Sequence, residues 1–182
     1  MVPLSAWRQS LDASDTKIMR LALHELSLIH SKLMGDPTDL PRFGALAFQR
    51  SGHTSPVLAE TDHDGRESTA EIVWLSQNLT VLEVLDGNRV TEYGAEAVAL
   101  AYVNAKAGWV VKRKLRRGES ADWLLRNQAG WLALEVSGTI GRDAFTRLEN
   151  KKQQVSRCTL PADELLAIVV SFDRPLIVAG SP

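Results

Sequence analysis

The chain of 182 residues contains a single cysteine, Cys158, so neither a disulfide bond nor a cluster of thiolate ligands can form within one copy. A reducing compartment suits such a chain, and we expect a cytoplasmic protein. No stretch approaches the roughly 18 uninterrupted apolar residues of a membrane-spanning helix, and residues 1–8 lack the apolar core of a secretion signal. These absences exclude a disulfide-stapled scaffold and predict that the protein does not associate with membranes.

Proline is also scarce, with seven residues, and no repeat or low-complexity tract is present, which excludes a disordered, fibrous or solenoid chain. Hydrophobic residues make up 45% of the sequence and charged residues 24%, as in a globular domain with enough apolar material for a core. Length and composition therefore predict one folded domain, or a small core with an appended region.

The net charge of −1 conceals an uneven distribution along the chain. Residues 1–88 contain 7 Lys and Arg against 12 Asp and Glu, whereas residues 89–182 contain 14 against 10. We therefore divide the chain into an acidic N-terminal region over residues 1–88 and a basic core over residues 89–182. The acidic region suits a protein partner, and the basic core suits a polyanion such as nucleic acid.

The acidic region is predicted to be helical at first and then β-rich. Residues 14–34 carry apolar side chains at helical spacing and predict a helix. Short apolar runs between polar, glycine-containing stretches then predict strands, at residues 45–48, 57–59, 72–75 and 79–85. The sequence Asp62-His63-Asp64-Gly65 indicates a turn rather than a metal-binding loop, because the other ligands of an EF-hand are missing.

The basic core has a clearer order of elements. Residues 92–106 predict a helix, with Thr91 as its N-cap and Gly108 after its last turn. Three short strands, a second helix, a further strand and a final edge strand follow, at residues 109–115, 121–125, 131–136, 142–157, 166–172 and 176–179. The order helix, three strands, helix, strand predicts an α/β domain with helices on both faces of its sheet.

Glu135 lies in the predicted strand at residues 131–136, whose other residues are all apolar. A carboxylate buried there needs a proton, an ion pair or a bound cation. Asp122 opens the preceding strand, and a turn near residue 128 would place the two carboxylates roughly 5 to 8 Å apart. Two acids this close predict a divalent cation, and Mg²⁺ (or Mn²⁺) is the candidate because one or two carboxylates commonly hold it.

With these residues the basic core resembles the PD-(D/E)xK nuclease superfamily, over residues 90–180. The resemblance rests on the element order and on the segments 120–125 and 134–138. It implies a restriction-endonuclease-like core in which Asp122 and Glu135 hold the metal and Val136 offers its backbone carbonyl. It further implies Mg²⁺-dependent hydrolysis of phosphodiester bonds in DNA, although Ser137 stands where the family's pattern has lysine.

Some branches of the superfamily supply that lysine from the following helix, here residues 142–157. Phe145, Leu148 and Val155 define an apolar stripe on this helix; Lys152 falls angularly between Phe145 and Leu148, and Lys151 lies on the other side of Leu148. We expect Lys152, and otherwise Lys151, to neutralise charge on the phosphate or to help activate the attacking water. The alternative is that both lysines extend into solvent.

Glu96 is a further candidate, one helical turn after Glu92 in the predicted helix at residues 92–106. The resemblance implies an additional acid near the metal on this helix, and Glu96 is the residue that we assign to it. The alternative is that both glutamates are favourable charges near the N-terminus of the helix.

A basic run lies between the first two predicted strands of the core. Alternation along a strand would place Lys112, Lys114 and Arg116 on one face, and Arg113 and Arg117 on the other. We expect Lys112, Lys114, Arg116 and Arg117 to contact the phosphodiester backbone of nucleic acid. A charged hairpin tip that faces solvent is the alternative.

The sequence thus predicts an α/β nuclease of restriction-endonuclease type with an N-terminal helical and β-rich extension, with Mg²⁺ or Mn²⁺ as cofactor and DNA as partner. Two alternatives stay open. One is a nuclease-fold module that has lost catalysis, as Ser137 permits, and binds nucleic acid or protein. The other is an accessory or immunity-type subunit whose acidic region binds a basic protein. A homodimer is compatible with the nuclease prediction, because such folds often cut both strands as dimers.

Overall fold

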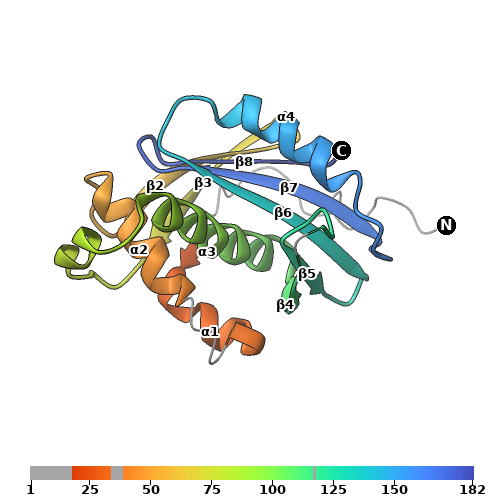
Figure 1. The fold of residues 1–182 in the computed structure, drawn as a ribbon, viewed down its shortest axis with the longest axis horizontal. Helices are drawn as coiled ribbons and strands as arrows, with labels where there is room; N and C mark the ends of the chain where they lie inside the picture. Colours follow the sequence, from red (N-terminus) through yellow and green to blue (C-terminus); the bar gives the residue numbers. More distant parts are fainter. Residues whose placement is uncertain (1–17, 34–38, 117) are drawn as a thin grey trace.

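An eight-stranded mixed sheet forms the centre of the computed structural model, which describes residues 18–33, 39–116 and 118–182 (Figure 1). In their order across the sheet, the strands are β1 (Met19–Ala22), β3 (Arg66–Val73), β2 (Val57–His63), β8 (Leu176–Gly180), β7 (Glu164–Ser171), β6 (Trp131–Thr139), β5 (Trp123–Arg126) and β4 (Val110–Lys114). The fold therefore belongs to the general α/β class, as predicted.

Helices cover both faces of the sheet, which confirms the expectation from the element order (Figure 1). The described helices are η1 (Leu23–Glu25), α1 (Leu26–Ile29), η2 (Ser31–Leu33), α2 (Leu40–Arg50), η3 (Leu79–Glu83), α3 (Gly87–Ala107) and α4 (Ala144–Val155). The long helix α3 packs on one face, and α4 packs on β6, β7 and β8 from the other. Among the described helices, none has the length and apolar character needed to cross a membrane.

The predicted helix at residues 92–106 is confirmed as part of α3, but its cap differs. The side chain of Asp86 accepts hydrogen bonds from the N–H groups of Asn88 and Arg89, whereas Thr91 lies inside the helix and donates to the Gly87 carbonyl. Gly108 ends the helix in the left-handed conformation that glycine adopts without strain.

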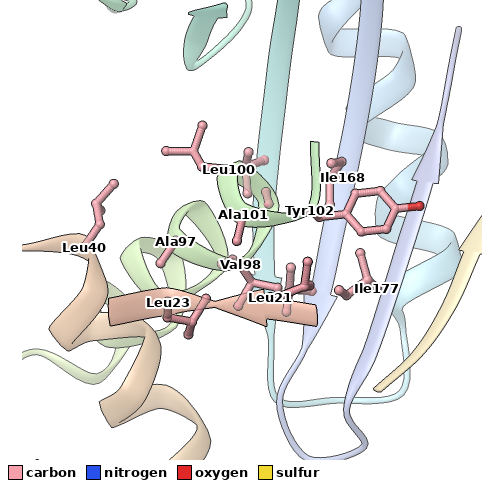
Figure 2. Packing of buried hydrophobic residues seen from close by; sticks show 14 of the residues in the cluster. Leu21, Leu23, Leu40, Ala97, Val98, Leu100, Ala101, Tyr102, Ile168 and Ile177 are labelled. Atoms are coloured by element: carbon pink, nitrogen blue, oxygen red, sulfur yellow. The ribbon is translucent and has the colours of Figure 1, made fainter. Parts of the chain in front are cut away.

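The helix α3 is buried along its middle because it lies between two layers. Its residues 94–103 are all buried, with the sheet on one side and α2 on the other. Leucine, isoleucine and valine side chains from α3, β1, β7 and β8 pack together in this main core, to which Tyr102 of α3 also belongs (Figure 2). A helix that is apolar almost all round is expected in such a position.

In the basic core, the three strands at residues 109–136, the helix α4 and the strand β7 are confirmed. The strand predicted at residues 176–179 is confirmed as β8, but its expected place at the edge of the sheet is wrong, because β8 pairs antiparallel with β7 and parallel with β2. The acidic region thereby contributes β1, β2 and β3 to the same sheet. The division of the chain after Asn88 does not coincide with a division of the sheet.

The helix predicted over residues 14–34 is wrong where the structure describes it. Residues 19–33 form the short strand β1 followed by η1, α1 and η2, while residues 14–17 and 34 lie outside the described residues. The strand β1 forms because it pairs in parallel with β3, from Met19 opposite Ala70 to Ala22 opposite Val73. A partner so distant in the sequence leaves no trace in local periodicity.

Two of the strands predicted in the acidic region are also wrong. Residues 45–48 belong to α2, where Gly44 and Ala47 allow the helix to approach α3 closely, and residues 79–85 contain η3 instead of a strand. The other two predictions are confirmed in β2 and, as far as Val73, in β3. The turn at Asp64-Gly65 is confirmed as well: it joins β2 to β3 with φ angles of 52° and 77°.

Candidate functional site

Glu135 and Asp122 meet on the face of the sheet that α4 covers. Glu135 is only 1% exposed and lies in β6 between Leu134 and Val136, whose side chains enter the main core on the opposite face. Asp122 directly precedes β5; its N–H donates to the Leu134 carbonyl at 2.9 Å, and its Oδ2 accepts from the Val136 N–H at 2.8 Å. The structure therefore brings the two acids together, as cross-strand geometry led us to expect.

Burial shifts both acids toward the protonated form, and for Glu135 the nearby Asp122 adds to the shift. Burial, and next the charge of Asp122, raise the pKa of Glu135 to about 7, although Lys151 acts against this shift. Burial also raises the pKa of Asp122, whereas the hydrogen bond from the Val136 N–H and the positive charges of Lys151 and Lys114 lower it. At neutral pH, the pair is thus poised to bind a proton or another cation.

The lysine that reaches this pair is Lys151. Its Nζ lies 2.5 Å from Oε1 of Glu135, while Nζ of Lys152 contacts Oε1 of Glu149 at 3.3 Å. The expectation that Lys152, in preference to Lys151, reaches the acid pair is therefore wrong. It placed Phe145 on the apolar stripe, but Phe145 is 53% exposed. The buried stripe of α4 consists of Ala144, Leu148 and Val155, which puts Lys151 on the inner side.

One oxygen of Glu135 has no donor. Oε2 is buried and, in the part of the chain that the structure describes, makes no hydrogen bond to a donor. An ionised carboxylate oxygen left in this state is costly, because burial removes water without supplying a replacement. A proton shared with Asp122 or a bound cation would remove that cost.

Glu96 points inward, as expected, but it pairs with a lysine. From α3, on the opposite face of the sheet from Glu135, it accepts hydrogen bonds from Lys114 Nζ at 2.8 and 3.2 Å. The same ammonium group lies 5.1 Å from the ring centroid of Tyr93 and 4.9 Å from that of Trp123. Burial raises the pKa of Glu96, and Lys114 opposes that shift.

The described residues include no group of three or more His, Cys, Asp or Glu side chains that could hold a metal ion. Glu96 is thus not assembled with the acid pair into one cluster. The oxygen ligands on offer at the candidate site are the two carboxylates and backbone carbonyls.

The predicted alternation of the basic run is wrong, because β4 contains an irregularity. The register with β5 shifts between Val111 and Arg113, so that Arg113 lies opposite Leu124 and Lys114 opposite Trp123. Lys112 sits at this bulge and does not alternate with its neighbours.

Several of the basic side chains are already paired. Arg113 binds Glu119 through two hydrogen bonds of 2.8 and 3.0 Å, and together with the Arg116 N–H it lowers the pKa of Glu119 to about 2. Lys114 is held by Glu96, as described above. Lys112 and Arg116 are exposed, and Arg117 lies outside the described residues.

A surface cavity of about 440 Å³ opens beside the acid pair. Its lining residues come from the segment that precedes β5 and from α4, and they include Arg116, Asp122 and Gln154. Gln154 also accepts a hydrogen bond from Lys151 at 3.1 Å. Sequence reasoning did not single out Gln154; its position three residues after Lys151 on the same helix was the available signal.

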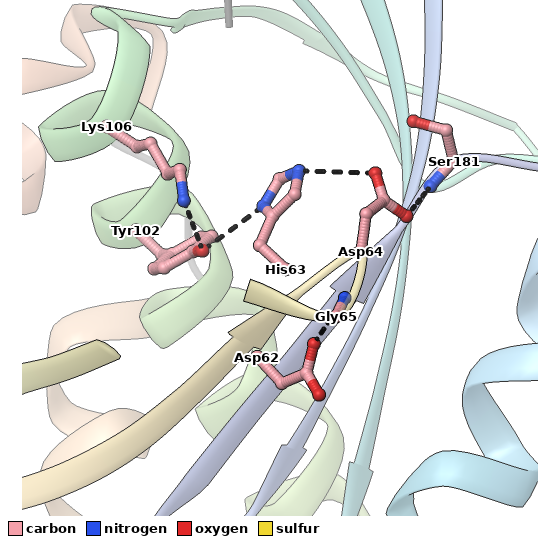
Figure 3. A network of polar contacts seen from close by, with 7 residues as sticks. All are labelled: Asp62, His63, Asp64, Gly65, Tyr102, Lys106 and Ser181. Atoms are coloured by element: carbon pink, nitrogen blue, oxygen red, sulfur yellow. Dashed lines mark hydrogen bonds and ion pairs between the residues drawn. The ribbon is translucent and has the colours of Figure 1, made fainter. Parts of the chain in front are cut away.

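A second polar network lies at the turn between β2 and β3 (Figure 3). Nδ1 of His63 is 3.2 Å from the Tyr102 hydroxyl, to which Lys106 donates at 3.3 Å, and Nε2 of His63 is 3.8 Å from Asp64. Burial lowers the pKa of His63 to about 4 and raises that of Tyr102. Asp64 also accepts from the N–H of Ser181, so the network ties this turn to α3 and to the end of β8. These contacts hold the turn, the helix and the strand end against one another. Tyr102 and Lys106 were not among the predicted site residues.

Comparisons of the chain with protein-family models, with curated proteins and with solved structures find no match.

Proposed function

We propose that the chain contains a restriction-endonuclease-like core, beginning at α3, and acts as a metal-dependent nuclease on DNA. The element order α3, β4, β5, β6, α4, β7, with helices on both faces, supports the fold assignment. The observation that carries the function is the buried pair of Asp122 and Glu135, in which one oxygen lacks a donor and a lysine lies alongside.

The donor atoms of the site fit a hard divalent cation. Asp122 and Glu135 would hold Mg²⁺ or Mn²⁺ through carboxylate oxygens, which these ions prefer. The N–H of Val136 points to Asp122, and the carbonyl of the same residue points to the same side of the strand, where it could supply a third oxygen. When bound, the ion would polarise a phosphate oxygen and lower the pKa of the attacking water.

The protein's own residues would act on the phosphate through charge. When water attacks phosphorus, one P–O bond forms and another breaks; the water loses a proton, the leaving oxygen gains one, and negative charge builds up on the phosphate oxygens in between. The ammonium group of Lys151, held at the acid pair by α4, would stabilise that charge. Exposed Lys112 and Arg116 would contact neighbouring phosphates.

Cleavage assays with matched variants test the proposal. Supercoiled, linear and single-stranded DNA, and RNA, are incubated with purified protein and Mg²⁺ or Mn²⁺. Asp122→Asn and Glu135→Gln should each lower the rate of DNA cleavage on the order of 100-fold or more. Glu149→Gln, the same type of change at an exposed position of α4, should leave the rate unchanged. Cleavage that is equal in all four proteins would come from a contaminating enzyme and would contradict the assignment.

Metal titration separates the alternatives. Calorimetric uptake of Mg²⁺ or Mn²⁺ by the wild type, lost in Glu135→Gln, is expected for the nuclease. Binding of nucleic acid without metal uptake or cleavage would identify a nuclease-fold module without catalysis. Binding of neither would leave a protein partner for the acidic region as the remaining candidate.

A further inference from the structure

The side chain of Gln154 shares a lysine with the acid pair. Lys151 Nζ donates to Oε1 of Glu135 at 2.5 Å and to Oε1 of Gln154 at 3.1 Å. Gln154 also lines the cavity into which Asp122 opens. The ammonium group therefore lies between a buried carboxylate and an amide at the border of the cavity.

The two acceptors differ in strength and accessibility. The Glu135 bond is charge-assisted and part-buried, so it dominates while no other cation is present. The Gln154 bond is weaker, but it lies within the same helix at a spacing of three residues, which keeps it within reach of Lys151 whatever happens at Glu135. The buried neighbours Leu148 and Val155 fix this face of α4 against the sheet.

A divalent cation at Glu135 changes the balance between these acceptors. An ammonium group and a metal ion at one carboxylate repel each other, so Lys151 loses its stronger acceptor when the metal is bound. Among the described residues, Gln154 supplies the other hydrogen-bond acceptor of Lys151. We infer that Gln154 is a positioning residue, which holds the Lys151 ammonium group at the border of the cavity, facing the phosphate, once a divalent cation occupies the acid pair. This inference rests on the proposed metal-dependent function.

The ¹⁵N resonance of the Lys151 ammonium group reports on this role without any substrate. It is assigned by its loss in Lys151→Arg and recorded with and without saturating Mg²⁺. Gln154→Met removes the amide oxygen acceptor and keeps the length of the side chain. Gln154→Glu keeps an oxygen acceptor at this position. Gln153→Met is the matched control, because Gln153 is an exposed neighbour of the same type on the same helix. Backbone amide spectra verify that each variant keeps the fold.

Without Mg²⁺, the ammonium signal should be visible in all of these glutamine variants, because Glu135 holds the lysine. With Mg²⁺, it should shift but persist in the wild type, Gln153→Met and Gln154→Glu, and disappear through rapid exchange with water in Gln154→Met. Persistence in Gln154→Met, together with a metal-induced shift, would overturn the role of Gln154 and leave the metal site standing. If Mg²⁺ shifts nothing in the wild type, the metal site itself is wrong, and the role of Gln154 is overturned with it.

Discussion

At the scale of single residues, His30 shows how burial fixes a protonation state. Its Nδ1 accepts from the Val111 N–H at 3.2 Å, which leaves Nε2 to donate to the Leu100 carbonyl at 3.3 Å. The ring is fully buried, and this burial lowers its pKa to about 4. The neutral imidazole thus links the segment after α1 to α3 and β4. A second proton, on Nδ1, would face the Val111 N–H and would find no acceptor there.

The folding stability contributed by His30 should fall in mild acid. Its pKa is 6.5 in the unfolded chain and about 4 in the folded one, so between these values unfolding takes up a proton. The contribution is complete above about pH 6.5, declines as the pH falls, and levels off near pH 4, with a total loss of about 3 kcal/mol. Urea unfolding of wild type and His30→Gln at pH 7 and pH 5 measures it.

His30→Gln keeps a side-chain acceptor and a donor but cannot titrate. The wild type should therefore lose about 2 kcal/mol more than the variant between the two pH values. His63, whose pKa is also lowered to about 4, is present in both proteins and cancels in the comparison. Identical pH dependence of the two proteins would contradict the buried neutral state of His30.

At the scale of elements, the close approach of α3 to β6 depends on a missing side chain. A Cβ atom at Gly138 would lie 2.3 Å from the Thr91 carbonyl oxygen, which is helix backbone and cannot move aside. Gly138→Ala should lower the free energy of unfolding by roughly 2 to 3 kcal/mol, because it separates α3 from the strand that carries Glu135. Chemical denaturation measures the effect.

Gly141→Ala is the matched control, because its Cβ would lie 3.4 Å from the nearest atom, a carboxylate oxygen of Asp143. It should change the free energy of unfolding by less than about 0.5 kcal/mol. Equal effects of the two substitutions would show that the contact between α3 and β6 is not tight.

The sequence predicted those elements whose signals are local. The helix α3 has an alanine-rich composition and a terminal glycine. Glu135 stands in an otherwise apolar strand, and this alone predicts a partner for its carboxylate. By contrast, β1 forms through pairing with β3, and the bulge at Lys112 is a property of two strands together. The helical pattern favours Lys152 over Lys151 only if Phe145 is buried, and whether an apolar side chain is covered depends on parts of the fold that are distant in the sequence.

At the scale of the whole molecule, the sheet unites the acidic region and the basic core. The helix α2 covers α3, and β2 pairs with β8 from Glu60 opposite Leu176 to His63 opposite Ala179. A fragment of residues 87–182 would expose the side of α3 that α2 covers and one edge of β8.

We expect that fragment to lack a cooperative thermal unfolding transition, and the full chain to unfold in a single one. Circular dichroism and calorimetry of both proteins check this. A fragment that unfolds cooperatively and gives a dispersed amide spectrum would instead establish residues 87–182 as an independent domain.

The place of β8 in the sheet also matters during synthesis on the ribosome. This strand joins two blocks, β1-β3-β2 and β7-β6-β5-β4, and it follows all seven of their strands in the chain. Until it emerges, β2 and β7 each present an open edge at which other nascent chains can pair. A translation product cut short before Leu176 would therefore carry two additional open strand edges, and the segment Leu176–Gly180 closes both of them at once.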